Sequence, residues 1–158
     1  MFESVVTVRD SIRIARPIDV VRQQFGDVRH HASRAVHPDV KFTVLSESGN
    51  ECRYRHEVRV AGVCQVAEVI LKREADGSQT NHFVSGNNVG MKVIHTFQPD
   101  GPDATIAGVA VQLPLRGLRK VLAPLVRLAV RRKLVKGLQE DRGDLEERGY
   151  PGRLSRAG

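Results

Sequence analysis

The stretch LPLRGLRKVLAPLVRLAVRRKLVKGLQEDRGDLEERG, residues 113–149, decides the fold. Its leucines recur with roughly the 3.6-residue period of a helix, which is typical of an amphipathic helix that covers a sheet. Pro124 should begin or kink this helix, because proline lacks a backbone donor and clashes with the preceding turn. We therefore expect one long helix near the end of the chain. Its apolar stripe consists of Leu118, Leu122, Leu125, Leu128, Leu134, Leu138 and Leu145.

Upstream of this helix the apolar residues follow the period of two that is typical of strands with one dry face. Short links such as ESGN and ADGS look like tight turns, which favours antiparallel neighbours in chain order. After the first strand, Pro17 and the helical spacing that follows it predict two short helices ending by Pro38. The seven predicted strands begin at Ser4, Val40, Glu51, Val63, Gln79, Gly90 and Asp103.

This order of elements resembles the START and Bet v 1-like superfamily, also called SRPBCC, which includes polyketide cyclases and small-molecule carriers. The most similar stretches are residues 16–31, 96–106 and 113–149. The resemblance implies an α+β helix-grip fold, in which a curved seven-stranded antiparallel sheet surrounds the long C-terminal helix. It also implies a cavity between sheet and helix. We expect one domain over residues 1–150 and a flexible tail over residues 151–158.

Composition limits the function classes. The chain has 158 residues, 41% of them hydrophobic and 27% charged, and no apolar run approaches the length of about 20 residues that spans a bilayer. The formal net charge of +7 would suit nucleic acid, but aromatic residues make up only 4% and tryptophan is absent, so no base-stacking surface is expected. The N-terminus shows no secretory signal, and we expect a cytoplasmic protein.

The segment DVRHHASRAVHP, residues 27–38, holds three of the six histidines. In a continuous helix His30 and His37 would share a face, although Pro38 favours an extended conformation at His37. Two histidines and one carboxylate are the ligand set of a mononuclear non-haem ferrous site, so a third ligand from elsewhere would complete one.

The long helix offers that carboxylate. Asp141 interrupts the apolar stripe and has no basic residue three or four positions away, so it needs a cation, a donor or a metal if it is buried. Glu140 and Asp144 have Lys136 and Arg148 one turn away, respectively, which predicts ordinary exposed helix pairs.

This arrangement resembles the catalytic domain of Rieske-type ring-hydroxylating oxygenases. The resemblance implies Fe(II) held by His30, His37 and Asp141, with Asp27 supporting one histidine. Two features depart from that family: the histidines lie further apart in sequence, and an iron–sulfur module is missing, so an external electron donor would be required. The alternative is that His30 and His31 are surface residues, His37 lies in a turn, and Asp141 pairs with an arginine of the sheet.

Three further residues fall on strand phases that would face a cavity: His56, His95 and Tyr54. They would shuttle protons in a metal-independent polyketide cyclase or aromatase, since histidine is suited to proton transfer near neutral pH. The alternative is that both histidines are core residues satisfied by their neighbours.

The long helix also carries many basic residues beside its leucines. They form either a solvated face or a docking surface for an anionic membrane or an acidic redox partner. The main hypothesis is a protein that binds a hydrophobic small molecule, with or without Fe(II); a metal-free carrier and a polyketide cyclase are the alternatives. Sequence leaves open whether the protein is an enzyme, which ligand it binds and its oligomeric state.

Overall fold

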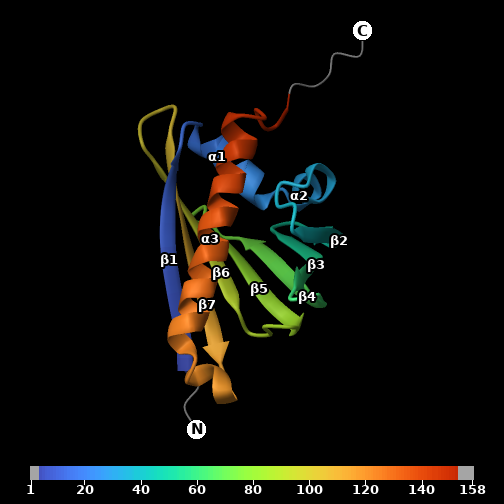
Figure 1. The fold of residues 1–158 in the computed structure, drawn as a ribbon. Coiled ribbons are helices and arrows are strands. Elements are labelled where there is room, and N and C mark those ends of the chain that lie inside the picture. Colours follow the sequence, from blue (N-terminus) through green and yellow to red (C-terminus); the bar gives the residue numbers. More distant parts are fainter. Residues whose placement is uncertain (1–3, 153–158) are drawn as a thin grey trace.

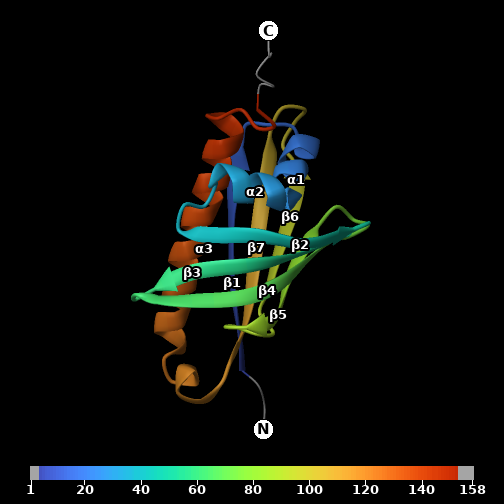
Figure 2. The same ribbon diagram turned by 90° about the vertical axis from the view of Figure 1, so that its right-hand side faces the viewer.

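The structure is a computed structural model that describes residues 4–152. Seven antiparallel strands form one sheet in the order β1-β7-β6-β5-β4-β3-β2, and helix α3 lies across its concave side (Figure 1). Figure 2 shows β2, β3 and β4 running across the direction of β7, so the sheet is strongly curved. The strands are β1 (Ser4–Ile14), β2 (Val40–Ser48), β3 (Glu51–Val60), β4 (Val63–Arg73), β5 (Gln79–Gly86), β6 (Lys92–Pro99) and β7 (Thr105–Leu115).

The helices are α1 (Ile18–Gly26), α2 (Val28–Arg34), the 3-10 turn η1 (Gly117–Lys120) and α3 (Ala123–Glu146). Helices α1 and α2 follow β1 and lie together near the C-terminal end of α3 (Figures 1 and 2). The predicted α+β helix-grip fold is therefore confirmed. Strand β6 begins at Lys92 and β7 at Thr105, each two residues later than predicted. Of the predicted tail, residues 153–158 lie outside the described part of the chain.

Strands β1 and β7 build one half of the core. They pair antiparallel along their whole length, from Ser4 opposite Leu115 to Ile14 opposite Thr105. Alternate residues of β7 are buried, which is the period of two that the sequence shows there. A second cluster forms around β3, β4 and β5, and the partly buried Met91 and Val93 contact both clusters.

The leucine stripe is buried only over the C-terminal part of α3. Leu138 is 4% exposed and Leu145 is fully buried, whereas Leu118 is 85% and Leu125 is 64% exposed. The prediction that all these leucines face the sheet is wrong for the first four. Leu118 and Leu122 precede α3, which begins at Ala123, and Leu125 and Leu128 lie on the outer face of its first turns. In its first turns the face toward the core is formed instead by Ala123, Val126 and Val130.

Pro124 occupies the first turn of α3, where a missing backbone donor costs little. Among residues 4–152, the helices are all too short or too polar to cross a membrane.

Candidate functional site

A cavity of about 700 Å³ lies between the sheet and α3. Its volume falls in the range of roughly 300–1,000 Å³ that is common for small-molecule sites. The lining is mainly apolar and comes from strands of both core clusters and from α3. Its larger apolar members include Phe25, Phe42, Leu71, Phe83, Met91 and Leu134.

Aromatic and imidazole rings form one continuous wall of this cavity. The ring centre of Phe42 lies 5.7 Å from those of Tyr54 and His56, and His56 lies 5.6 Å from Phe83. His31 joins the wall from α2, with its ring centre 6.0 Å from that of Phe42. Such a wall offers ring faces and edges to a flat apolar ligand.

Three polar side chains meet at one end of the cavity: His31, His37 and Asp141. The Oδ1 atom of Asp141 lies 3.1 Å from Nε2 of His31 and 3.4 Å from Nε2 of His37. One potential ligand atom from each residue lies within 4.8 Å of the other two. Helix α2 supplies His31, the link to β2 supplies His37, and α3 supplies Asp141, so the fold brings together distant parts of the chain.

The Nδ1 atoms of His31 and His37, which face away from Asp141, each lie beside an oxygen that can accept a hydrogen bond. Nδ1 of His31 lies 2.8 Å from the carbonyl oxygen of Asp27 and must carry the hydrogen, because a carbonyl can only accept. Nδ1 of His37 lies 3.3 Å from Oε1 of Glu140. In a neutral His31 the lone pair of Nε2 would therefore face the Asp141 carboxylate. A lone pair and a carboxylate repel each other at this distance, so the contact is favourable only with a proton on Nε2 or a metal ion between the two atoms.

Electrostatics in this cluster follow from its burial. Burial alone would lower the pKa of His37, but the charge of Asp141 and hydrogen bonds to Asp141 and Glu140 outweigh it and raise the pKa to about 9. Burial would likewise raise the pKa of Asp141, but the charge of His37 and hydrogen bonds from His31 and His37 lower it well below its usual range. Asp141 is therefore ionised.

A buried amide connects this cluster to a second one. The Gln24 side chain is fully buried, and its Nε2 donates to Oδ1 of Asp141 at 3.1 Å and to Oδ2 of Asp144 at 3.0 Å. His30 meets the same Asp144 oxygen at 2.7 Å, and Tyr150 donates to Asp27 at 2.7 Å. Helices α1, α2 and α3 are thus tied together by polar groups.

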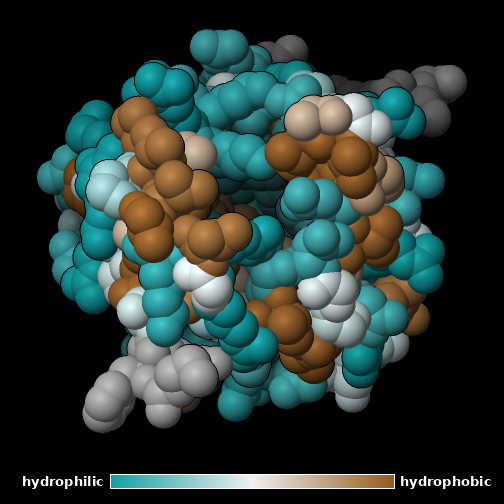
Figure 3. Space-filling model, turned by 60° about the horizontal axis from the view of Figure 1, so that its bottom comes forward, coloured by the Kyte–Doolittle hydropathy of each residue, from teal (hydrophilic) through white to brown (hydrophobic). Residues whose placement is uncertain are grey.

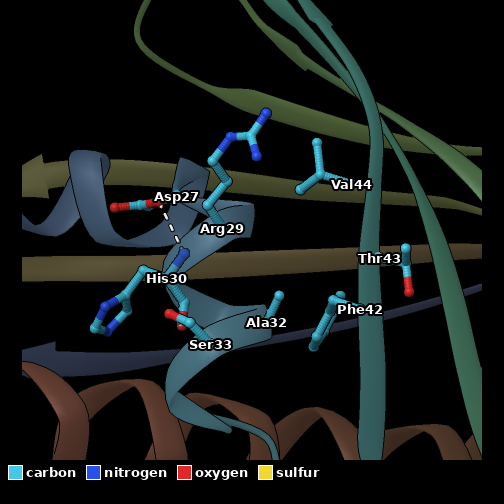
Figure 4. A pocket seen from close by; sticks show the side chains of 8 residues that line it. All are labelled: Asp27, Arg29, His30, Ala32, Ser33, Phe42, Thr43 and Val44. Atoms are coloured by element: carbon cyan, nitrogen blue, oxygen red, sulfur yellow. Dashed lines mark hydrogen bonds between the residues drawn. The ribbon is translucent and has the colours of Figure 1, made fainter.

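The structure places His31, and not the predicted histidine His30, beside His37 and Asp141. Asp27 caps α2 by accepting from the His30 backbone amide, and its carbonyl, not its carboxylate, holds His31. Figure 4 shows the His30 ring pointing away from Phe42 and the other β2 side chains of a second, shallower pocket.

Glu140 and Asp144 are not the exposed helix pairs that their spacing predicts. The Asp144 side chain is 2% exposed, because α1 and α2 cover this part of α3. Lys136 pairs with Asp39 instead of Glu140, and Arg148 donates to the Arg34 carbonyl. The alternative of an arginine partner for Asp141 is also wrong, since its partners are His31, His37 and Gln24.

Gln24 and His31 were missed by reasoning from sequence, although a signal for each exists. Gln24 stands three residues after Val21 and four before Val28, so it occupies the buried face of a helical pattern. His31 follows Val28 by three residues and falls on the same face. Both residues are less than one tenth exposed.

His56, His95 and Tyr54 all line the cavity, as their strand phases predict. Burial, followed by the charges of Lys133 and His37, lowers the pKa of His56 to about 4. Burial also lowers the pKa of His95 to about 4, and the charge of Asp141 opposes this only in part. Both imidazoles are therefore neutral at pH 7.

Tyr54 has a hydrogen-bond partner for its buried polar atom, whereas His95 leaves one of its ring nitrogens without one in the described chain. Tyr54 donates its hydroxyl hydrogen to Oδ1 of Asn81 at 2.8 Å, and burial raises its pKa further above the ordinary value. His95 stacks edge-on against Phe25 at 5.1 Å, and its Nδ1 is buried without a hydrogen-bond partner in the described chain.

No protein-family model matches the chain, and no curated protein matches its sequence. Solved structures do match. The Zhui aromatase/cyclase from Streptomyces sp. R1128 has a TM-score of 0.79 at 17% identity, covering 95% of this chain and 100% of that one. A START superfamily protein from Mycobacterium smegmatis has a TM-score of 0.75 at 16% identity, covering 89% of this chain and 97% of that one.

Norcoclaurine synthase from Thalictrum flavum, in complex with dopamine and hydroxybenzaldehyde, has a TM-score of 0.64 at 11% identity and covers 86% of this chain and 85% of its own. Identities this low establish the fold and leave function to the site. The resemblance to Rieske-type oxygenases finds no support in these structures. The chain has the helix-grip fold of the START and Bet v 1-like superfamily.

Proposed function

We propose that the protein binds a small hydrophobic, ring-containing molecule in the cavity between the sheet and α3. The observation that carries this proposal is the cavity itself, with a volume of about 700 Å³, a wall of adjacent rings and polar groups gathered at one end. Burying an apolar ligand against such a wall is favourable by roughly 25 cal/mol for each Å² removed from water. Norcoclaurine synthase, described with two aromatic ligands, offers a precedent on the same fold.

The ligand should also carry a polar group. His31, His37 and Asp141 line one end of the mainly apolar cavity, and a few such polar groups commonly fix the orientation of a ligand.

Native mass spectrometry of protein purified from cells tests this proposal. We expect a retained organic molecule, or saturable binding of the apolar fluorescent probe Nile red if the natural ligand is lost on purification. A protein that retains no molecule and binds no probe would refute the proposal.

Chemistry of the aromatase/cyclase type is one use of this cavity. The match to Zhui supports it at the level of fold, and His56 and His95 are neutral and so able to accept a proton. Tyr54 would position the substrate and not transfer a proton, since its raised pKa keeps the hydroxyl protonated. Cyclisation of a poly-ketone thioester that continues unchanged when all three residues are replaced would exclude this use.

A metal-dependent function is the second candidate, and the orientation of the two imidazoles favours it. Each has its Nδ1 held by an acceptor and its Nε2 turned toward Oδ1 of Asp141, as metal-bound histidines commonly do. Ligands at right angles around an ion about 2.1 Å away lie about 3 Å apart, close to the separations of Asp141 from the histidines. Two histidines and one carboxylate suit Fe(II) and leave positions open for oxygen and substrate.

Elemental analysis after anaerobic loading with Fe(II) tests this candidate. We expect stoichiometric iron in the wild type, and loss of iron in His31→Ala and Asp141→Ala. His30→Ala is the matched control, since His30 contacts Asp144 and should not be needed for metal binding. A protein that binds no iron, or that loses it equally in His30→Ala, would contradict the site.

A further inference from the structure

The segment that leads into α3 exposes an unusual amount of apolar surface. Five residues form what we call the leucine surface: Leu118, Val121, Leu122, Leu125 and Leu128, which are 85%, 79%, 49%, 64% and 47% exposed. Single exposed apolar side chains are ordinary, but five within one short segment are typical of an interaction site on a folded protein.

The same part of the chain is strongly basic. Residues 113–139 contain eight lysines and arginines and no aspartate or glutamate. The basic residues are Arg116, Arg119, Lys120, Arg127, Arg131, Arg132, Lys133 and Lys136. Lys136 is paired with Asp39 on the link before β2, and Arg127 donates to the Thr7 carbonyl. Arg131 and Arg132 are exposed beside Leu128, so apolar and positive groups occupy one continuous surface.

This surface borders the cavity. Arg119 of η1 and Val126, Ala129 and Lys133 of α3 line the cavity wall. Arg119 also donates to Asn88, which lies in the link between β5 and β6 and lines the cavity from the sheet side. Figure 3 looks at this end of the molecule and shows a hollow with hydrophobic side chains on both sides of it.

We propose that this end of the protein docks on an anionic lipid bilayer. The leucine surface enters the headgroup region, and the basic residues around it contact lipid phosphates. An apolar strip with charge of one sign beside it is the surface that an anionic bilayer complements. Docking in this orientation turns the cavity toward the lipid, so a hydrophobic ligand can exchange with the membrane; that last point rests on the ligand binding proposed above.

Sedimentation with lipid vesicles tests the docking. We expect binding to vesicles of phosphatidylcholine mixed with phosphatidylglycerol, and little binding to phosphatidylcholine alone. The double variant Leu118→Ser/Leu125→Ser should bind about tenfold more weakly, since two apolar side chains no longer enter the bilayer. Arg131→Gln/Arg132→Gln should also weaken binding and make it less sensitive to salt.

Leu45→Ser is the matched control. Leu45 is 40% exposed, but it lies on β2, at the far edge of the sheet from β1, and should not affect vesicle binding. Equal binding by the wild type and the leucine double variant would overturn the proposal. A wild type that is dimeric by light scattering and becomes monomeric in the double variant would also overturn it, because the leucine surface would then be a subunit interface.

Nile red binding separates this proposal from the proposed function. The leucine double variant should bind the probe as the wild type does, since neither leucine lines the cavity. Loss of vesicle binding with retained probe binding supports docking. A protein that docks but binds no probe would refute the proposed function and leave the docking intact.

Discussion

The side chains of His31 and Asp141 are each 8% exposed, and they meet through Nε2 and Oδ1 at 3.1 Å. The contact joins α2 to α3 at one end of the cavity. A carboxylate in this position is stable only while positive or donating groups surround it. The stability of the protein therefore depends on the same side chains that are the candidates for its chemistry.

Replacement of Asp141 tests this dependence. We expect Asp141→Ala to lower the free energy of unfolding by about 2–4 kcal/mol in urea titrations, because His31, His37 and Gln24 lose their common acceptor. Glu140→Ala is the control, since Glu140 makes a single 3.3 Å contact with His37, and it should cost about 1 kcal/mol or less. Equal losses in the two variants would show that Asp141 has no special place in the network.

Acid should destabilise the protein through His56 and His95. Their pKa values are about 4 in the folded protein, against an ordinary value of 6.5, so the unfolded chain binds more protons between these limits. Their contribution is complete above pH 6.5 and is lost as the pH falls toward 4, by up to about 1.4 kcal/mol per pH unit for each histidine. Thermal melts over this range should show the slope, and His95→Gln should flatten it.

His37 affects stability in a different pH range from His56 and His95. The pKa of His37 is raised to about 9, so its contribution is complete below 6.5 and is lost as the pH rises through 9. An acid slope in His95→Gln that equals the wild-type slope would show that His95 is not the neutral, buried group described above.

Filling the cavity should weaken ligand binding without unfolding the protein. Val130 lines the cavity from α3, and the larger side chain of Val130→Phe can extend into open space. We expect Nile red to bind at least about tenfold more weakly, with an unchanged or higher melting temperature. Leu128→Phe on the outer side of α3 is the control and should bind the probe normally. Normal binding by Val130→Phe would place the probe elsewhere.

The two halves of the leucine stripe should differ sharply in their effect on stability. Leu145 is fully buried and Leu125 is 64% exposed. We expect Leu145→Ala to cost about 2–5 kcal/mol by chemical denaturation, and Leu125→Ala to cost no more than about 0.5 kcal/mol. A large cost at Leu125 would mean that this leucine is covered in solution.

The fold could be predicted because its signals are local. Alternation along β7 and the turn-like links between strands report which face is dry and where the chain reverses. The extent of the buried stripe could not be predicted, because Leu118 and Leu122 precede the start of α3. Their spacing matches the later leucines, but a helix that begins at Ala123 does not carry them on its face.

The site was predicted in part. Asp141 stood out as a charge on an apolar face, and His37 as a histidine in the same short segment. The choice between His30 and His31 depends on the angle at which α2 meets α3, and adjacent residues on a helix differ by about 100° in direction. The spacing of His31 from Val28 indicates that His31 shares the buried face of α2, but sequence carries no local signal for the angle that brings this face to Asp141. The paired partners of Lys136 and Arg148 were missed for the same reason, since they come from outside α3.

The pairing of β1 with β7 has a consequence for biosynthesis. Within residues 4–152, strand β1 comes first in the chain but pairs with β7, the last strand, and α3, which packs on β1, follows later still. Contacts between segments so far apart in sequence form slowly. An unpaired strand edge is prone to aggregation until its partner strand has been made. We therefore expect the sheet to remain incomplete during synthesis until β7 and α3 have been made, with the edge of β1 unpaired during that time.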